Sequence, residues 1–325
     1  MISPGAAPAK VQWQRWIGPV AGLVILALAL VALRAIAREV DIADVVAAVH
    51  ATPTTTLIAA GVFTVLSYVV LTGYDWLALE HLGYRLPYRQ VANAAFVSYT
   101  MSHTLGLTAL TGGTVRYRFY TRAGVKALDV VLIVALCGWT FWLGVVMLAG
   151  IGLVVDPAVA TPSDHLSPVA NGAVGLLLLV SAGGYSLFAS LYRRPLRLWQ
   201  MRFTLPDGRS TLKQLVLGAL DLGLAAAALY ILLPADDLPP FPAFLTVYAV
   251  AMILGALSHA PGGLGVFEAV VLVMLPRAPK EDVLAALFLF RVIYTLIPFA
   301  AGLLLLAVTE LRAWRARTHS ATLPP

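Results

Sequence analysis

Two short polar stretches interrupt an otherwise apolar sequence, and they resemble each other. Ser102-His103 leads into a Gly/Thr-rich run that ends at Arg116, and Ser258-His259 leads into a Pro/Gly-rich run that ends at Glu268. Each stretch combines a hydroxyl, an imidazole, glycines and one strong charge. Glycine allows close backbone approach, and the N–H groups at the start of a helix favour phosphate or carboxylate. These residue types therefore indicate a binding site for a phosphate or a carboxylate.

The candidate binding residues come from three places in the chain. In the first stretch they are Ser102, His103, Thr111, Gly112, Gly113 and Arg116. In the second stretch they are Ser258, His259, Pro261, Gly262, Gly263, Gly265 and Glu268, and a later apolar segment adds Arg291. Arg116 is suited to bidentate phosphate binding, and Pro261 predicts the first turn of a half-helix. The candidate partners of Glu268 are Arg116, Arg291 or the cationic part of a substrate.

Each of these residues also has a purely structural interpretation. Paired glycines in membrane helices often serve close packing, and histidines can hydrogen-bond between helices. Arg116 could be a positive anchor at the membrane surface, and Glu268 with Arg291 could form a structural ion pair. Asp221 lies inside another apolar segment, where we expect it near a helix end or paired with Arg291.

Soluble-enzyme motifs are absent from the sequence. It contains no P-loop lysine, no Gly-x-Gly-x-x-Gly, no His-Glu-x-x-His and no Gly-x-Ser-x-Gly. We therefore expect no cofactor, no metal and no hydrolytic activity. An enzymatic alternative is a transferase that uses His103, His259 and Glu268 as acid–base groups.

Composition decides the class of protein. The chain is 60% hydrophobic and 12% charged, with a mean hydropathy of +0.86, well beyond soluble domains. It predicts an all-α, polytopic integral membrane protein in which residues 1–325 form a single transmembrane domain. The net charge of +6 is spread over separated inter-helix clusters, which fits cytoplasmic loops better than nucleic-acid binding. The lone Cys137 is expected to be a small packing residue.

Six segments are long and apolar enough to span a bilayer. They are 17–37, 54–79, 130–155, 169–192, 214–233 and 283–309. The first is expected to be an uncleaved anchor, because its apolar run is long for a signal peptide. Asp75, beside Tyr74 and Trp76 toward the end of the second span, is expected at the membrane interface. Pro298 predicts a kink in the last span.

The charged loops predict how these spans are oriented. The basic loops and tails should be cytoplasmic, and the neutral or acidic loops should lie outside. The first group is 1–16, 85–89, 116–126, 193–213 and 310–325, and the second is 156–168 and 234–240. This pattern fits if 91–115 enters and leaves from the cytoplasm, and 242–276 from the outside. The prediction is six full spans plus two re-entrant helical hairpins, with both termini cytoplasmic.

The predicted topology contains an inverted repeat. Residues 54–155 and 213–309 each read as span, hairpin and span, in opposite orientations. Transporters use inverted repeats to build a site near the bilayer midplane. Irregular backbone at that depth is tolerated only when it is buried or lines a cavity. We therefore expect the two hairpins to meet inside the protein.

The motifs at 102–106, 111–118 and 258–268 resemble the membrane domain of bacterial lysylphosphatidylglycerol synthase/flippase proteins, the multiple peptide resistance factor group. The resemblance covers nearly the whole chain. It implies a bacterial inner-membrane protein that moves a lipid between leaflets. Only about 16 residues follow the last predicted span, so we expect a stand-alone member without the synthase domain.

The resulting hypothesis is a flippase-like transporter for a phospholipid, which the resemblance extends to aminoacylated forms. The expected partners are membrane lipids and no nucleic acid. Homo-oligomers and a separately encoded lipid synthase are further candidate partners. One alternative function is a non-catalytic membrane subunit of such a synthase, and another is an intramembrane lipid-modifying transferase that uses the acid–base groups named above.

Overall fold

The computed structural model of the chain describes residues 42–106, 110–161, 165–191, 196–198, 201–203, 206–235 and 238–321. These residues are almost entirely helical. The helices are α2 (Ile42–Ala51), α3 (Thr54–His81), α4 (Tyr88–Leu105), α5 (Thr111–Arg122), α6 (Ala127–Val155), η1 (Pro157–Val159), α8 (Pro168–Leu191), α9 (Gly208–Tyr230), α10 (Phe241–Leu257), η2 (Pro261–Gly263), α11 (Val266–Met274), α12 (Lys280–Phe290), η3 (Arg291–Leu296) and α13 (Ile297–Ala321). A short antiparallel pair, β1 (Leu196–Leu198) and β2 (Met201–Phe203), lies between α8 and α9.

Within the described residues, five stretches of helix are long and apolar enough to cross a membrane. They are α3, α6, α8, α9 and the continuous stretch Lys280–Thr309. Each coincides with one of the predicted spans to within a few residues. The remaining predicted span, 17–37, and the tail 1–16 lie outside the described residues. The fold is therefore that of a multi-pass helical membrane protein.

Local sequence explains where several helices begin. Prolines directly precede α3, α4, α10 and α12. At a helix start, the fixed φ of proline and its missing N–H remove no hydrogen bond of the helix. Helix α9 begins instead with a side-chain N-cap: the Asp207 carboxylate accepts the amide hydrogen of Ser210 at 2.9 Å. That bond satisfies one of the free N–H groups of the first turn.

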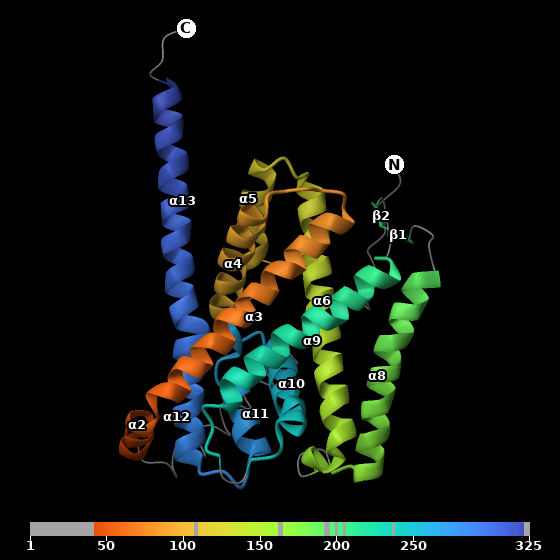
Figure 1. Ribbon diagram of the computed structural model, residues 1–325, viewed down its shortest axis with the longest axis vertical. Helices are drawn as coiled ribbons and strands as arrows, with labels where there is room; N and C mark the ends of the chain where they lie inside the picture. The colour runs from red at the N-terminus through yellow and green to blue at the C-terminus, as the bar shows by residue number, and fades with distance from the viewer. Residues whose placement is uncertain are drawn as a thin grey trace, which may run out of the picture.

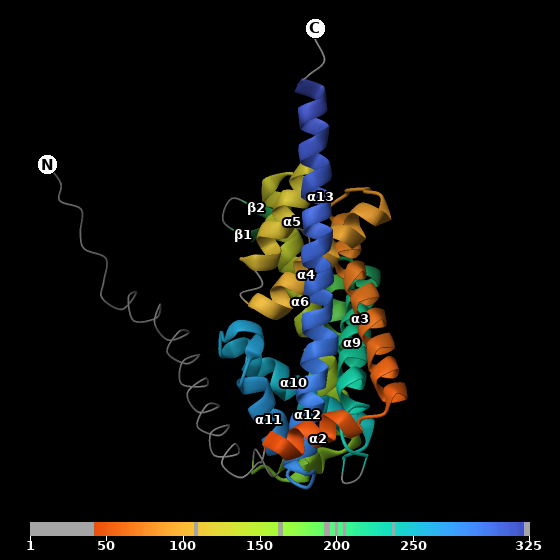
Figure 2. The same cartoon turned by 90° about the vertical axis from the view of Figure 1, so that its left-hand side faces the viewer.

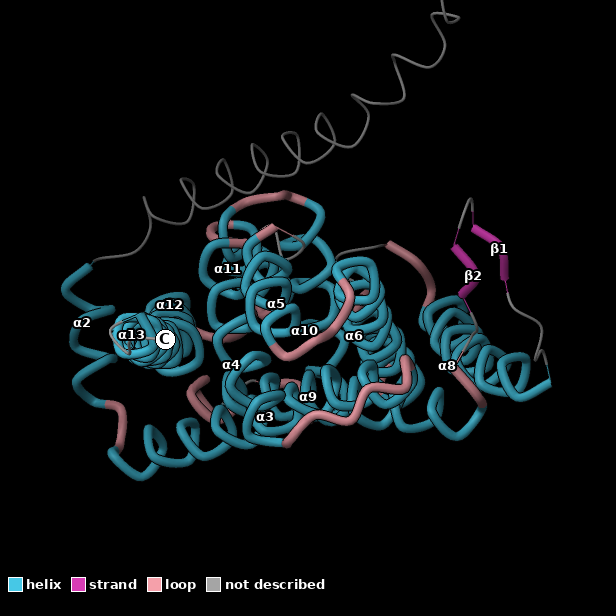
Figure 3. Tube along the Cα trace, turned by 90° about the horizontal axis from the view of Figure 1, so that it is seen from above, coloured by secondary structure: helices cyan, strands magenta, loops and turns pink. Residues whose placement is uncertain are grey.

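Two helical hairpins occupy opposite halves of the bundle. Helices α4 and α5 pack against each other in the half nearer to the end of α13, and α10 and α11 pack against each other in the other half (Figures 1 and 2). Helix α13 runs past the first hairpin to the C-terminal end. Viewed from above, α2 and α13 lie at one side of the molecule and α8 at the other (Figure 3).

Helices α3, α6 and α9 form the frame around the hairpins. Helix α9 packs along both α3 and α6. At the α6–α9 crossing, a Cβ on Gly144 would lie 2.5 Å from the backbone of Gly218. Only glycine permits this backbone contact, so the crossing joins the two predicted repeat units directly.

The last membrane-length stretch is irregular next to Pro298. Residues Arg291–Leu296 form a π-helical segment rather than the simple kink expected from the sequence. Pro298 has no N–H for the carbonyl of Tyr294, four residues earlier. That carbonyl instead accepts a hydrogen bond from the Tyr68 hydroxyl at 3.2 Å. Such π-segments are frequent at functional sites.

Candidate functional site

The tips of the two hairpins touch in the interior of the bundle. A Cβ on Gly106 would lie 3.1 Å from the backbone nitrogen of Gly262, and one on Gly262 would lie 2.8 Å from the carbonyl oxygen of His103. Gly106 and Gly262 have φ values of 70° and 58°, a region that L-residues rarely adopt. The two polar stretches singled out in the sequence are therefore brought together at these glycines. At these two glycines the backbones of the tips are in contact in this conformation.

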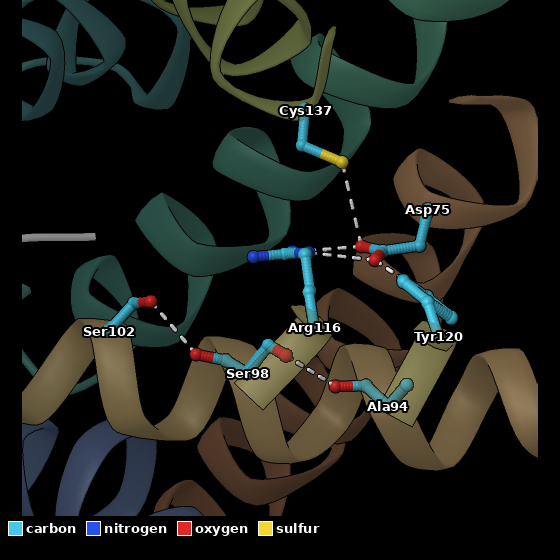
Figure 4. Close-up of polar contacts among 7 residues, drawn as sticks. All are labelled: Asp75, Ala94, Ser98, Ser102, Arg116, Tyr120 and Cys137. Atoms are coloured by element: carbon cyan, nitrogen blue, oxygen red, sulfur yellow. Dashed lines mark hydrogen bonds and ion pairs between the residues drawn. The ribbon is translucent and has the colours of Figure 1, made fainter. Parts of the chain in front are cut away.

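In the first hairpin, Arg116 is fully buried against Asp75 of α3. The Nε and Nη2 atoms of Arg116 each donate to one carboxylate oxygen at 2.8 Å (Figure 4). Tyr120 also donates to this carboxylate at 2.7 Å, and the guanidinium lies 4.5 Å from the centre of the Tyr99 ring. The exposed fractions are 1% for Arg116 and 0% for Asp75. A buried charge of this kind needs such compensation, so Arg116 acts here as a structural member of the hairpin.

This geometry corrects the expectation for Asp75. Its position beside Trp76 predicted an interface anchor, and for Trp76, which is 42% exposed, that interpretation fits. Asp75 directly precedes Trp76, and its side chain points into the protein. The helix also continues to His81, so Asp75 does not lie at its end.

The other residues of the first stretch hold the hairpin together. The hydroxyl of Ser102 donates to the carbonyl of Ser98 on its own helix at 2.8 Å. Gly112 packs directly on that hydroxyl, since a Cβ there would collide with Ser102. The hydroxyl of Thr111 donates to the carbonyl of Gly106 at 2.8 Å and so closes the tip. A Cβ on Gly113 would meet a side chain of α6 at an ordinary contact distance.

The second hairpin turns through three left-handed glycines. Gly262, Gly263 and Gly265 have φ values of 58°, 66° and 82°. The Ser258 hydroxyl accepts the amide hydrogen of Ala260 at 3.2 Å and thereby supports the turn that leads into Pro261. His259 is exposed and also left-handed, with φ 56°, and its Nδ1 lies 2.8 Å from the carbonyl of its neighbour Leu257.

The start of α11 is capped by its own carboxylate. Glu268 Oε2 accepts the amide hydrogen of Gly265 at 2.7 Å. The sequence predicted that a half-helix N-terminus at this position would offer its N–H groups to an anion. In this conformation a carboxylate of the protein already occupies that electrostatically favourable place.

Arg291 ties the last membrane-length stretch to the second hairpin. Its Nε donates to Glu268 Oε1 at 2.7 Å, and its Nη1 donates to the carbonyl of Gly262 at 2.7 Å. Its third nitrogen, Nη2, is buried and has no hydrogen-bond partner among the described residues. Of the candidate partners for Glu268, the structure selects Arg291. The pair is less enclosed than the Asp75 pair, with exposed fractions of 17% and 14%.

Comparison with known proteins places this geometry in a family. Residues 19–302 match the lysylphosphatidylglycerol synthase TM region family. The chain belongs to this family. It is 35% identical to the uncharacterized protein slr0712 of Synechocystis sp. over 92% of this chain and 94% of the relative. It is 29% identical to the inner membrane protein YbhN of Escherichia coli, over 87% and 89% of the two chains.

This member of the lysylphosphatidylglycerol synthase TM region family also has an aromatic cluster behind the first tip. His103 stacks on the Tyr294 ring, with centres 5.9 Å apart and planes 20° apart. Its Nδ1 lies 3.3 Å from the Tyr68 hydroxyl. Because Tyr68 uses its single hydrogen on the carbonyl of Tyr294, His103 must donate from Nδ1. The imidazole thus joins the tip to α3 and to the π-helical segment.

Asp221 was expected near a helix end or paired with Arg291, and the structure shows neither. It lies well inside α9, is 2% exposed, and accepts hydrogen bonds from Ser67 and Tyr74 of α3. Sequence reasoning gave little weight to it and none to Ser67, Tyr68 or Tyr294. Hydroxyl-bearing residues are common in apolar helices, so they carry no signal until a buried carboxylate or carbonyl is known to face them.

Two cavities lie beside the open end of the first hairpin. One, of about 530 Å³, is lined by Trp76, Tyr84 and Arg85 among others, and another, of about 290 Å³, by Gln90, Tyr120 and Arg122 among others. The Tyr84 hydroxyl donates to Asp129 at 2.6 Å, and this bond raises the pKa of Tyr84 above its ordinary value. Among the described residues, no cluster of His, Cys, Asp and Glu could hold a metal ion.

Proposed function

We propose that this protein moves a phospholipid between the two leaflets of the bacterial inner membrane. The head group would pass between the two hairpin tips when they separate. The observation that carries the proposal is the position of Arg291, which bridges Glu268 and the Gly262 carbonyl and keeps one buried nitrogen unpaired. A guanidinium with a free N–H beside a glycine turn suits a phosphate group.

The ion pair between Arg291 and Glu268 gives this path a physical gate. A phosphate that binds Arg291 competes with the Glu268 carboxylate for the same N–H groups. Glu268 is then released and can interact with a cationic part of the head group, such as an amine. The closed state is stabilised by the pair, and the loaded state by the lipid, so substrate binding and opening are linked.

This role changes the assignment of Arg116. The sequence suggested that Arg116 holds phosphate, but two of its nitrogens are bound to Asp75 in a fully enclosed site. In the proposal Arg116 fixes the first hairpin to α3, and Arg291 binds the anion.

The proposal includes a topology of six full spans and two re-entrant hairpins, with both termini in the cytoplasm. The ends of α5 and α13, the start of α9 and the β1–β2 pair all lie toward the same end of the bundle (Figure 1). Basic residues are frequent there, including Arg122, Arg209 and Lys213. An excess of Arg and Lys marks the cytoplasmic side of a membrane protein.

Reconstituted liposomes with a fluorescent phospholipid test the function. Loss of outer-leaflet fluorescence after adding a membrane-impermeant quencher measures translocation. We expect Glu268→Gln and Arg291→Lys to slow translocation about 10- to 100-fold, because each variant loses a charge-assisted hydrogen bond to the passing head group, worth about 1.5–3 kcal/mol. Lysine keeps the charge but cannot hold a carboxylate and a carbonyl with one planar fork.

Glu80→Gln is the matched control. Glu80 also pairs with a cation, Lys213, but at 3.8 Å and with both side chains more than half exposed. Its removal should leave the rate unchanged. Wild-type rates in both Glu268→Gln and Arg291→Lys, with the fold intact, would refute the proposed gate. A wild-type protein that moves none of the phosphatidylglycerol, aminoacylated phosphatidylglycerol and phosphatidylethanolamine probes would refute the function.

A further inference from the structure

Asp221 is a buried carboxyl group without a counter-ion. It is 2% exposed, and its oxygens accept hydrogen bonds from the Ser67 hydroxyl at 2.5 Å and the Tyr74 hydroxyl at 3.1 Å. The described residues contain no ion pair to it, whereas Asp75 and Glu268 each have an arginine. A carboxylate at membrane depth is costly when it has no cation beside it. Its neutral, protonated form suits this site equally well.

The groups that face Asp221 share one property: they are hydroxyls, which both donate and accept hydrogen bonds. The tyrosines near Asp221 are Tyr68 and Tyr74 of α3, Tyr248 of α10 and Tyr294 of η3. Helix α6 places Cys137 beside Tyr74. Of the other helices packed on α9, α8 carries Tyr185, which contacts Trp139, and α12 carries its acidic residues in its first turn.

We propose that Asp221 is a proton-binding site and that its protonation is coupled to opening of the hairpin tips. The coupling rests on the transport function proposed above. A proton from water joins the carboxylate to form the carboxylic acid, and it returns to water when the acid ionises. No other bond is made or broken, and no other reactant is needed.

A hydrogen-bonded chain transmits the change. Ser67 lies between Asp221 and the Tyr294 hydroxyl, at 2.5 and 2.9 Å. When Asp221 is ionised, Ser67 donates to it, so Tyr294 must donate to Ser67. When Asp221 is protonated, it donates to Ser67, and Ser67 in turn donates to Tyr294. The Tyr294 hydroxyl then no longer donates to Ser67, so its hydrogen can bond to another acceptor. One proton therefore redirects the hydroxyl of Tyr294.

Tyr294 is placed to pass this change to the tips. Its ring stacks on His103 at the end of α4, and its carbonyl binds Tyr68, which also contacts His103. It lies in the same π-helical segment as Arg291, the residue that holds the second tip. Protonation of Asp221 thus acts on both hairpins through one residue.

The spacing of the oxygens favours a proton over a metal cation. The Ser67 oxygen is hydrogen-bonded to an Asp221 oxygen at 2.5 Å and to the Tyr294 oxygen at 2.9 Å. Oxygens that surround a metal ion are directed at the ion instead of at each other. Lithium or sodium dependence is therefore an outcome that would contradict the proposal.

The test compares wild-type protein, Asp221→Asn and the control Glu80→Gln in liposomes that contain a pH-sensitive dye. Translocation of a fluorescent phospholipid is measured with and without an imposed pH gradient. We expect the wild type and Glu80→Gln to change rate with the gradient and to acidify or alkalinise the lumen during transport. Asp221→Asn should lose both responses. Ser67→Ala, which removes the reversible hydroxyl, should weaken them.

A second measurement does not depend on transport. Infrared difference spectra of the purified protein at two pH values report the C=O stretch of a protonated carboxyl group. We expect one such band to be missing in Asp221→Asn and present in Glu80→Gln. If the wild type moves no lipid but the band behaves as expected, the proposed function fails and the proton site stands. An unchanged band in Asp221→Asn, an unchanged gradient response in that variant, or a sodium gradient that replaces the pH gradient, overturns the inference.

Discussion

Replacing Asp75 by asparagine would leave the guanidinium of Arg116 buried without its counter-ion. Both side chains are essentially inaccessible, and two hydrogen bonds of 2.8 Å join them. Removing one partner of such a pair typically costs about 3–5 kcal/mol, since the remaining charge is neither solvated nor paired. An exposed pair between α3 and α9, Glu80 with Lys213, should be worth about 0–1 kcal/mol.

The protein carries its own reporter for this change. Cys137 is the only cysteine in the sequence and is 5% exposed, and its sulfur lies 3.6 Å from an Asp75 oxygen. A maleimide reacts with it only when the cluster opens. A loss of about 3 kcal/mol raises the open population about 100-fold, because each 1.4 kcal/mol is a factor of ten. In detergent, Asp75→Asn should therefore label about two orders of magnitude faster than wild type.

Two further variants make the result specific. Glu80→Gln should label at the wild-type rate. The double variant Asp75→Asn with Arg116→Gln should label more slowly than Asp75→Asn alone, because no unpaired charge remains in the protein. The reasoning is refuted if Asp75→Asn labels like the wild type, or if the double variant labels as fast as Asp75→Asn alone or faster.

Three other substitutions test local geometry. Gly144→Ala should lower the thermal unfolding temperature, because the new Cβ would lie 2.5 Å from the α9 backbone, whereas Gly138→Ala on the same helix meets open space and should be neutral or slightly stabilising. Gly262→Ala should abolish lipid translocation, since it strains a φ of 58° and places a Cβ 2.8 Å from an α4 carbonyl; Gly61→Ala, with nothing within 4 Å, should retain it. Asp207→Ala should destabilise α9 by about 1 kcal/mol in a denaturant titration. Hydrogen bonds from the first-turn serine hold the pKa of Asp207 below its ordinary value. Its contribution should therefore be present at neutral pH and be lost as the pH falls through that lowered value.

The membrane-length helices were predictable from the sequence. An apolar run longer than about 20 residues has few alternatives to a spanning helix, so α3, α6, α8 and α9 appear within a few residues of their predicted limits. The breaks at 106–111 and 258–265 were also visible, because glycine and proline end helices whatever surrounds them. Whether 54–155 and 213–309 are inverted repeats in the membrane stays a prediction.

The partners of the buried charges were not predictable in the same way. The length of the apolar run predicts that Asp75 lies on a membrane-spanning helix, but it does not predict which face of that helix packs against protein. Its aromatic neighbours suggested an interface, and the pairing with Arg116 depends on how α5 returns beside α3. The same holds for Asp221, whose partners are on another helix. Pairing the arginines with the carboxylates that lie in or beside apolar segments, by charge alone, would have suggested a carboxylate partner for Arg116.

The two ion pairs differ in a way that predicts which hairpin moves. The pair of Arg116 with Asp75 is fully enclosed, so separating it leaves two buried charges without a counter-ion, although Tyr120 still donates to Asp75. Arg291 and Glu268 are partly exposed, and each keeps a second bond when they part, to the Gly262 carbonyl and to the Gly265 amide. Opening at the second hairpin is therefore less costly, and we expect α11 to be the mobile element. Hydrogen exchange of the protein in lipid nanodiscs measures this directly: backbone amides of α11 should exchange faster than those of α5, and Glu268→Gln should increase the difference. Faster exchange in α5 would assign the motion to the first hairpin and contradict the gate proposed at Arg291.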